Sequence, residues 1–309
     1  MSDTPDISVV MSVYNAAAQL RESMDSILSQ EGVRLELIVV NDGSTNGSPT
    51  ILEEYANRDS RVKILHQENE GLTRALIRGC AAAKGKYIAR QDAGDISLPG
   101  RLIKQVNHLA ETPNAAFVSC ATRFVGPAGE YLFEVKREPR EADDRLMTLD
   151  LDRIQGPSSH PSTVFSRVLY ELVGGYRTAF YFAQDLDLWI RLGEVGRHIV
   201  MPEVLYQASF TLGSISGLYR KEQIETARLI LECARLRREG KSEEPGLQKA
   251  RRIRRPAKRR HNRLGRARAL YFIGVCLKKR KDPLAQDYFK QALLAFPFHV
   301  KSAARLLLG

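Results

Sequence analysis

The sequence predicts an α/β protein with a mostly parallel central sheet, helices on both faces of that sheet, and an α-helical extension after it. Three observations support this. Short apolar runs alternate with segments of helical spacing from Ile7 onwards. The runs are continuous, which is typical of strands buried on both faces. Their strand, helix, strand order favours parallel pairing, because parallel neighbours need a crossover connection.

The individual elements follow from these patterns and from the turn residues between them. Apolar runs predict the strands, and Leu20, Met24 and Ile27 share one face of the first helix. Pro49 suits the first turn of a helix, where its missing N–H would have no partner. We expect strands at residues 7–13, 35–40, 61–65 and 86–90, and helices at residues 17–29, 49–58 and 72–83.

The pattern changes after residue 115. The runs "AAFVSCA" and "EYLFEV" flank a turn at Gly126 to Gly129, which predicts an antiparallel pair. A helix is expected at residues 142–149 and a longer one at 217–239, before the linker "GKSEEPG". We therefore expect a main domain at residues 1–216 and a helical C-terminal extension at residues 217–309.

The end of the chain has the spacing of a helical repeat. Gly274, Ala285, Phe289, Ala292 and Pro297 resemble one tetratricopeptide-like repeat. A single repeat cannot bury its own apolar face. It should therefore pack on neighbouring helices or on the main domain.

The positive charge of the chain is concentrated in one tract. The formal net charge is +11, yet residues 249–268 contain eleven Lys or Arg and no acid, which leaves 36 basic and 36 acidic residues elsewhere. This distribution, without interleaved aromatic residues, argues against a nucleic-acid partner. One interpretation of the tract is a solvated linker, and the sharper one is contact with an anionic membrane surface.

Several features are absent from the sequence. The start "MSDTPDISVV" has no basic region ahead of an apolar run, and no apolar stretch approaches the roughly 20 residues of a membrane span. The four cysteines form no CxxC and the six histidines no HExxH, so we expect reduced thiols and no structural zinc. We expect a cytoplasmic protein, for which peripheral contact with the inner membrane face stays open.

Three polar turns follow three of the expected strands. They are Tyr14-Asn15, Asp42-Gly43-Ser44, and the turn from Asp92 to Asp95. Each alone is explained as a simple turn, because Asp and Gly favour tight turns. In parallel sheets, however, ligands bind beyond the carboxyl ends of the strands. GxGxxG and GxxxxGK[ST] are both absent after the first strand, so a nucleotide here would be held by carboxylates and loop backbone.

Six stretches, taken in order, carry a family resemblance: "SVVMSVYNAAAQLRESMDSILSQ", "ELIVVNDGSTNGSPTILEEY", "NEGLTRALIRGCAAAKGKYIARQDAGDISLPGRLIKQ", "HPSTVFSR", "GGYR" and "QDLDLWIRL". The set resembles a family 2 glycosyltransferase with the Rossmann-like GT-A fold, over about residues 7–216. The resemblance implies a nucleotide-activated sugar as donor, with a UDP-sugar expected.

The resemblance also implies roles on the donor side. Tyr14 and Asn15 would border the nucleotide base, and Asp42 would hydrogen-bond the base or the ribose. Asp92 matches the first aspartate of the family's DxD motif, which contacts ribose and helps to place the metal. The other positions expected at the nucleotide sugar are Gly71, Arg74 and Arg90.

The metal ligands of the family are only partly present. Gly94 stands where the second aspartate of DxD is usual, while Ser209 and Thr211 replace an arginine and a histidine. We expect a divalent cation, Mg or Mn, held by Asp92 and Asp95, since Gly94 lets the loop re-aim the second carboxylate. Otherwise the arginines named above would neutralise the diphosphate.

The resemblance places the general base and the acceptor side later in the chain. Asp185 matches the aspartate of the family's ED motif, the catalytic base, with Gln184 in place of the glutamate. An inverting transfer needs a carboxylate to take the acceptor's hydroxyl proton. The simpler interpretation of an acid here is that it complements a helix dipole, and we expect that role for Asp187. His160 and Trp189 match positions that line the acceptor side.

Several function classes stay open on the sequence. The first is an active glycosyltransferase that transfers a hexosyl or related group to a saccharide or lipid-linked acceptor in cell-surface polysaccharide or glycolipid synthesis. The second is a catalytically silent sugar-nucleotide-binding module, which the replaced metal ligands would suit. A nucleotidyltransferase shares a related fold, but the glycine- and lysine-rich triphosphate loop expected near the first strand is absent.

Overall fold

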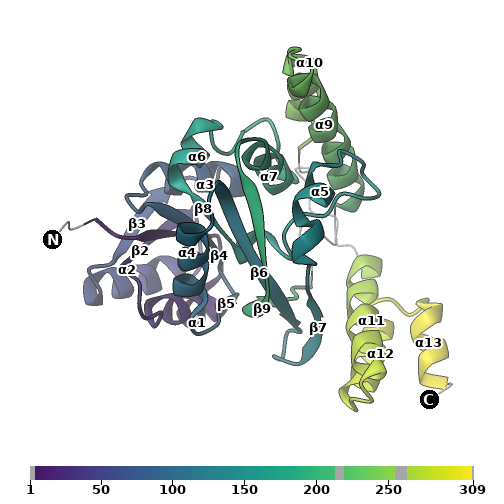
Figure 1. Cartoon of the computed structure of the whole chain (residues 1–309). Helices are drawn as coiled ribbons and strands as arrows, with labels where there is room; N and C mark the ends of the chain where they lie inside the picture. Colours follow the sequence, from purple (N-terminus) through teal and green to yellow (C-terminus); the bar gives the residue numbers. More distant parts are fainter. Residues whose placement is uncertain (1–3, 213–218, 255–262, 308–309) are drawn as a thin grey trace. The chain divides into compact units, whose positions relative to one another are not determined.

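The structure, a computed structural model, describes residues 4–212, 219–254 and 263–307 (Figure 1). The chain divides into two compact units. The first comprises Met1–Thr122, Val135–Gln207 and Glu225–Arg254, and the second comprises Arg123–Glu134, Ala208–Ile224 and Arg255–Gly309. The domain boundary predicted at Ser216 lies outside the described residues, as does the centre of the basic tract, and the division at that point stays a prediction.

One side of the sheet is formed by four parallel strands. They lie in the order β3 (Val62–Gln67), β2 (Leu35–Asp42), β1 (Ile7–Val13) and β4 (Tyr87–Asp92). The sheet continues with β8 (Thr163–Ser166), β6 (Ala115–Val125), β9 (Arg197–Ser209) and β5 (Ile96–Ser97). β8 is antiparallel to both β4 and β6. The expected α/β sheet with parallel strands and an antiparallel continuation is confirmed.

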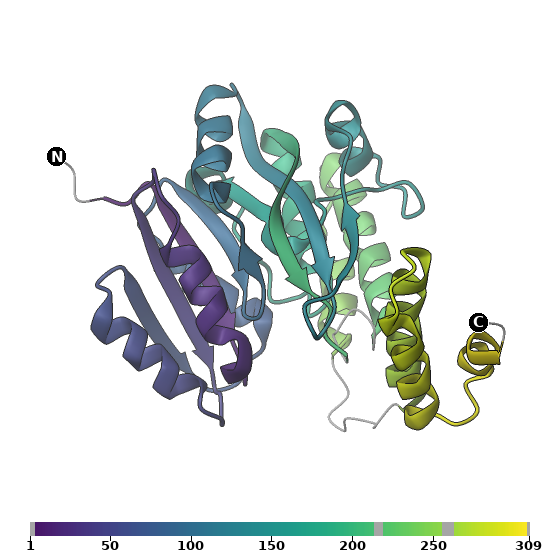
Figure 2. The same ribbon diagram turned by 90° about the horizontal axis from the view of Figure 1, so that it is seen from below.

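Helices lie on both faces of this sheet (Figures 1 and 2). Those next to the sheet include α1 (Ala17–Leu28), α2 (Ser48–Arg58), α3 (Leu72–Ala81), α4 (Arg101–Glu111), α6 (Arg167–Leu172) and α7 (Gln184–Val195). The helices α5 (Ala142–Met147), α9 (Arg220–Arg238) and α10 (Glu244–Arg252) contribute apolar residues to the core that contains α7. The linker expected at residues 240–246 is shorter in the structure, because α10 already begins at Glu244. The sequence of α10 opens with Glu244 and Pro245, both favourable in the first turn of a helix.

The continuous apolar runs make fully buried strands. Every residue of β2 is buried, and β1 is buried at all positions but Ser12. On one face, Val10, Ile38 and Ile88 join a core that also contains apolar residues of α3 and α7. This packing fixes the sheet and α7 relative to one another, and the candidate site is built from both.

The second unit contains β7 (Tyr131–Val135), which pairs with β6, and the helices α11 (Arg263–Lys279), α12 (Leu284–Ala295) and α13 (Val300–Leu307). The expected helical tail is confirmed. α11 and α12 pack closely at Gly274, where an added Cβ would lie 2.6 Å from the Phe289 ring. No helix in the described residues is both long enough and apolar enough to cross a membrane.

Candidate active site

The parallel register brings the three polar turns to one edge of the sheet. Ser12 lies opposite Asp92 on the neighbouring strand, and Val13 lies opposite Asn41. Asp42 lies opposite Gln67, the last residue of β3. The loops that follow β1, β2, β3 and β4 therefore start side by side, as the rule for parallel sheets requires.

Asp42 is the organising carboxylate at the β2 end. It is 3% exposed, and its Oδ1 accepts hydrogen bonds from Gln67 Nε2 (2.7 Å) and the Glu70 amide (2.9 Å). Its Oδ2 accepts one from the Gly71 amide (3.0 Å). Gly71 has φ +89°, a conformation that favours glycine, and precedes the first residue of α3. Asp42 thus holds the β3–α3 loop against the end of β2.

Tyr14 and Asn15 lie on the adjacent loop. The Asn15 amide donates to Ser44 Oγ (3.0 Å), and its Oδ1 accepts from the Thr45 amide (2.8 Å), so the loops after β1 and β2 are joined. The Tyr14 side chain is 52% exposed beside this junction. A ring held on an ordered loop and open to solvent is suited to stacking on a planar ligand.

Asp92 ends β4 with one carboxylate oxygen engaged. The buried Arg90 donates through Nη2 to Asp92 Oδ1 (2.7 Å) and through Nη1 to the Val10 carbonyl (2.8 Å). The Arg90 side chain is fully buried, whereas that of Asp92 is 42% exposed. Arg90 therefore supports Asp92 from below, and the carboxylate faces outward. Arg74 behaves differently, since it is exposed on α3 and pairs with Glu70 (3.6 Å).

Asp95 is buried, although it lies in the same turn. Tyr206 of β9 donates its hydroxyl proton to Asp95 Oδ2 (2.9 Å), and the Asp95 carbonyl accepts from Ser23 Oγ and Gln91 Nε2 (2.8 Å each). Between the two aspartates, Gly94 has φ +102°, and a Cβ there would meet only Gln19 at 3.8 Å. The turn is shaped by its hydrogen bonds rather than by lack of space.

These residues are a partial fit to a divalent cation. Asp92 presents an accessible carboxylate, while Asp95 is buried and its Oδ2 accepts a hydrogen bond from Tyr206. The described residues contain no cluster of three or more His, Cys, Asp or Glu that could hold a metal. Mg²⁺ is commonly bound through one or two carboxylates plus substrate phosphates, so this donor set suits a cation that arrives with a diphosphate.

Asp185 lies in the first turn of α7, after Ala183 in the left-handed conformation (φ 50°). Burial raises the pKa of the Asp185 carboxyl, and the negative charge of Asp92 raises it further. Hydrogen bonds from the backbone of Leu186 and of Asp185 itself, together with the charge of Arg90, oppose this shift. The carboxylate is therefore within electrostatic reach of the β4 end, and it is a better proton acceptor than an ordinary aspartate.

His160 lies in the same cluster. Its Nε2 is 2.8 Å from the Tyr176 hydroxyl, and its ring meets Trp189 edge to face at 5.7 Å. Burial, followed by the positive charge of Arg90, holds the pKa of His160 well below its usual value, so the ring is neutral. Trp189 is 2% exposed and lies behind His160, stacked on Phe117 at 5.1 Å. The acceptor roles predicted for His160 and Trp189 stay predictions.

Asp187 lies in the first turn of α7, as its interpretation as a helix-dipole acid requires, but it also has a second role. Asp187 is 1% exposed and forms ion pairs with Arg177 and with Arg191, whose Nη2 lies 2.6 Å from Asp187 Oδ2. Arg177 also donates to Glu243 Oε2 (2.8 Å). The i, i+4 spacing to Arg191 was visible in the sequence, and the "GGYR" motif contained Arg177. This network fixes the helix that carries Asp185.

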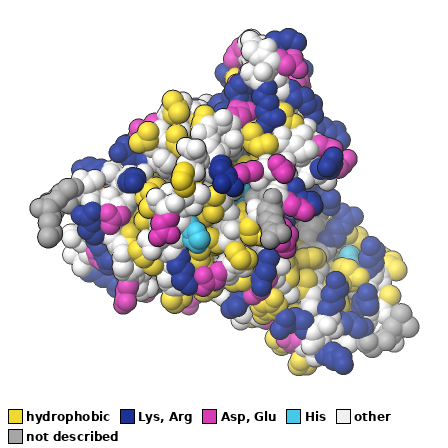
Figure 3. Space-filling view, in the orientation of Figure 1, with side chains coloured by type: hydrophobic (Ala, Val, Ile, Leu, Met, Phe, Trp, Pro, Cys, Tyr) yellow, Lys and Arg dark blue, Asp and Glu magenta, His cyan; other side chains and the backbone are white. Residues whose placement is uncertain are grey.

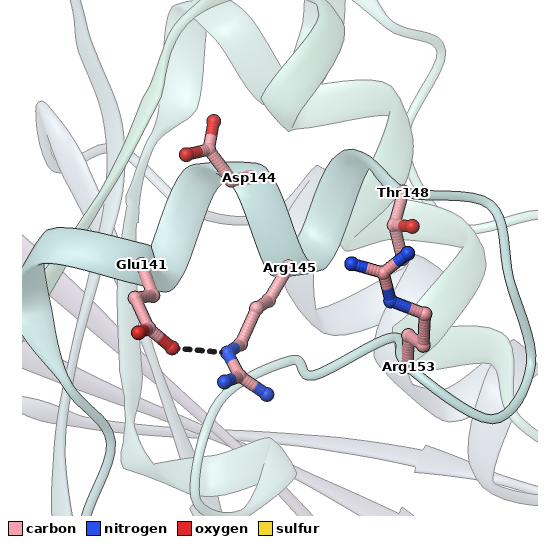
Figure 4. Close-up of a pocket in the computed structure, with 5 residues that line it drawn as sticks. All are labelled: Glu141, Asp144, Arg145, Thr148 and Arg153. Atoms are coloured by element: carbon pink, nitrogen blue, oxygen red, sulfur yellow. Dashed lines mark hydrogen bonds and ion pairs between the residues drawn. The ribbon is translucent and has the colours of Figure 1, made fainter.

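A separate hollow opens beside α5, as Figure 4 shows. Its volume is about 360 Å³, and it is lined by Glu141, Asp144, Arg145, Thr148 and Arg153. Glu141 and Arg145 form an ion pair across one turn of the helix. None of the predicted site residues lines this pocket, so it is distinct from the cluster around Asp92 and Asp185.

Comparison with known proteins gives the family. The model of glycosyl transferase family 2 matches residues 8–171, more than half of the chain. The chain belongs to this family. Among curated relatives of this glycosyltransferase is the Bacillus subtilis (strain 168) protein EpsE, whose name assigns it to the glycosyltransferases. It is 30% identical over 243 residues, which cover 77% of this chain and 85% of EpsE.

One further curated relative and two solved structures are also similar to this chain. The chondroitin synthase of Pasteurella multocida (strain Pm70) is 26% identical over 202 residues, but the match covers only 20% of that protein. The mannosyltransferase PcManGT from Pyrobaculum calidifontis, solved with GDP-Man and Mn2+, has a TM-score of 0.56 at 21% identity and covers 99% of this chain and 86% of that one. S. aureus TarS 1-349, solved with UDP-GlcNAc, has a TM-score of 0.57 at 15% identity, covering 97% and 89%. The glycosyltransferase therefore has the expected GT-A fold.

Proposed function

We propose that this glycosyltransferase transfers a sugar from a nucleoside-diphosphate sugar to an acceptor hydroxyl with inversion, and that Asp185 is its general base. The observation that carries the proposal is the Asp185 carboxyl, whose raised pKa reflects burial and the nearby charge of Asp92. One carboxylate that can take a proton, set beside another at the mouth of a parallel sheet, suits a single displacement at a sugar carbon.

The steps assigned to the protein are few. Asp185 accepts the proton of the acceptor hydroxyl while the oxygen attacks the anomeric carbon, and the bond from that carbon to the diphosphate breaks. The neutral His160 and the adjacent Tyr176 form the wall beside this reaction. A base held in place by its helix raises the rate through positioning as well as through proton transfer.

The donor is assigned to the edge of β1, β2 and β4. Tyr14 and Asn15 border the base, and Asp42, with Gly71 beside it, accepts hydrogen bonds from the base or ribose. A carboxylate oxygen can accept more than one hydrogen bond, so the loop contacts of Asp42 leave it capacity for a ligand. A UDP-sugar is the expected donor, and a carboxylate oxygen of Asp42 can accept a hydrogen bond from the N–H of uracil.

We assign a divalent cation to Asp92, with Asp95 as the second carboxylate. When bound, the cation would neutralise the charge that develops on the departing diphosphate. Support comes from the exposed face of the Asp92 carboxylate. Mn2+ is present in the structure of the related mannosyltransferase. We assign to Arg90 and Arg74 the positive charge that the site has in addition to the cation.

The acceptor is assigned to a saccharide or lipid-linked saccharide in cell-surface polysaccharide or glycolipid synthesis. The matched chondroitin synthase supports a polysaccharide process. We assign the basic tract at residues 249–268 to an anionic membrane surface, where a lipid-linked acceptor would be found.

A catalytically silent sugar-nucleotide-binding module is the second candidate. Gly94 and Thr211 favour it, because both replace usual metal ligands, and Asp95 is buried against Tyr206. The two candidates differ in one respect. The silent module binds the nucleotide sugar but transfers nothing.

UDP binding is expected to require Mn or Mg and to weaken in EDTA. Asp95→Ala should weaken the metal-supported binding by about 10–100-fold, as is usual when a partner of a metal site is lost. The measurement is calorimetric titration of UDP, then of GDP and dTDP, with Mn, with Mg and with EDTA. Asp152→Ala, a change at an exposed residue, is the control. Metal-independent binding that is unchanged in Asp95→Ala would contradict the assignment of the cation.

The rate of transfer should fall as the pH is lowered through the pKa of Asp185. The base works only when ionised, and burial raises its pKa above the usual 3.8, so the acidic limb of kcat lies above that value. Asp92→Asn removes a negative charge that raises this pKa, and its limb should move to lower pH. The test is kcat against pH at saturating donor. A limb that shifts upward in Asp92→Asn would contradict the assignment.

A further inference from the structure

The last helices of the second unit expose a group of large apolar side chains. Leu294 is 83% exposed, Phe298 81%, Val300 76% and Leu307 86%. We call these four residues the apolar edge. Single apolar residues on a surface need no explanation, but a group gathered in one short segment indicates a binding surface.

Two residues of the apolar edge, Val300 and Leu307, lie on one face of α13 together with Ala304. Val300, Ala304 and Leu307 follow the spacing i, i+4, i+7 and are all exposed. Ser302 faces the other way and is fully buried. α13 therefore packs on its own unit with one side and presents a second apolar side outward.

The surroundings of the apolar edge are strongly basic. Residues 263–309 contain ten Lys or Arg and only two acidic residues, Asp282 and Asp287. Lys301 and Arg305 are exposed on α13, one position after Val300 and Ala304. Figure 3 shows Lys and Arg side chains beside hydrophobic ones over the C-terminal helices. In the described part of the chain, neither Lys301 nor Arg305 has an acidic partner within ion-pair distance.

We propose that the apolar edge and the basic residues around it bind the surface of an anionic phospholipid membrane. An amphipathic helix with Lys and Arg beside exposed aliphatic side chains has the composition of an interfacial helix. The negative lipid headgroups complement its charge. Val300, Leu307 and the rest of the apolar edge would insert at the boundary between headgroups and acyl chains. Nucleic acid suits this surface less well, because three of the four exposed side chains are aliphatic and offer bases no ring to stack on.

This proposal goes beyond the membrane contact assigned to the basic tract. A polybasic tract alone binds through charge and is released by salt. Insertion of the apolar edge adds a contribution to the free energy of membrane binding that salt does not remove. A location at the membrane agrees with the proposed function. Vesicle binding, however, is measured independently of nucleotide binding and of sugar transfer.

The test is flotation of the full-length protein with vesicles of phosphatidylcholine and phosphatidylglycerol, compared with vesicles of phosphatidylcholine alone. Binding is expected for the anionic vesicles only. The triple variant Phe298→Ser, Val300→Ser, Leu307→Ser should bind about tenfold or more weakly. Lys301→Gln and Arg305→Gln should each weaken binding about fivefold.

Matched controls separate this surface from the rest of the chain. Val168→Ser with Leu172→Ser removes two other exposed apolar side chains, on α6, and should bind like the wild type. Calorimetric binding of UDP, unchanged in all these variants, shows that the donor site is intact. The proposal is overturned if the triple variant floats like the wild type. It is also overturned if the triple variant instead abolishes a dimer seen by light scattering, because the edge would then bind a second copy.

Discussion

Asp185→Asn is expected to lower kcat for sugar transfer by about 10²–10⁴-fold, the usual loss when a general base is removed. The asparagine amide keeps the size of the side chain but cannot take the acceptor proton. UDP binding should stay near the wild-type value, because the donor contacts are assigned to Asp42 and Asp92 at the sheet edge. Initial rates at saturating donor and acceptor measure the first effect, and calorimetry measures the second.

The control for this variant is Asp152→Asn, which makes the same chemical change at an exposed aspartate beyond α5. It should leave kcat unchanged. Full activity in Asp185→Asn would mean that another group takes the proton. Loss of UDP binding in the same variant would place Asp185 in the donor site instead. A wild type that binds UDP but transfers nothing to any acceptor would favour the silent module.

The parallel core was predictable because its signal is local. Continuous apolar runs such as Ile7–Val13 leave no polar face for solvent, so they had to be buried strands, and β1 has the same bounds in the structure. The position of Asp42 followed from the same reasoning, since loops at the carboxyl ends of parallel strands must share an edge. β2 is longer than expected because Asn41 and Asp42 still pair with β3.

Contacts between distant segments were not predictable from the sequence. Asp95 is buried and accepts a hydrogen bond from Tyr206, which lies 111 residues later in the chain. Nothing in the turn "DAGD" indicates that partner. Arg177 was part of a recognised motif, but its ion pair with Asp187 depends on how the loop before α7 folds. Sequence spacing could suggest only the partner on the same helix, Arg191.

The buried network around Asp187 leads to the second large prediction, Asp187→Ala. Asp187 accepts hydrogen bonds from Arg177 Nε (3.0 Å) and from Arg191 Nε (3.2 Å) and Nη2 (2.6 Å). Its removal takes the carboxylate away from Arg191 and leaves Arg177 with Glu243 alone, in a largely buried setting. Breaking a buried ion pair in this way typically costs about 3–5 kcal/mol in the free energy of unfolding.

Urea unfolding of the wild type and of Asp187→Ala measures this loss. The control is Glu54→Ala, which breaks the ion pair with Arg21 where both side chains are 49% exposed, and it should leave the urea midpoint close to that of the wild type. An unfolding midpoint in Asp187→Ala as high as in Glu54→Ala would show that the network does not stabilise the fold.

The effect should extend to catalysis, because Asp187 and Asp185 share the first turn of α7. Arg191 also donates to the Val173 carbonyl (2.6 Å) and the Gly175 carbonyl (2.7 Å), so the network ties α7 to the segment that carries Tyr176. Loosening it would move the base relative to the reacting oxygen, and a displacement of about 1 Å can lower a rate 10²-fold. In the folded fraction of Asp187→Ala we therefore expect kcat to fall while UDP binding persists. A folded fraction with wild-type kcat would limit the role of Asp187 to stability.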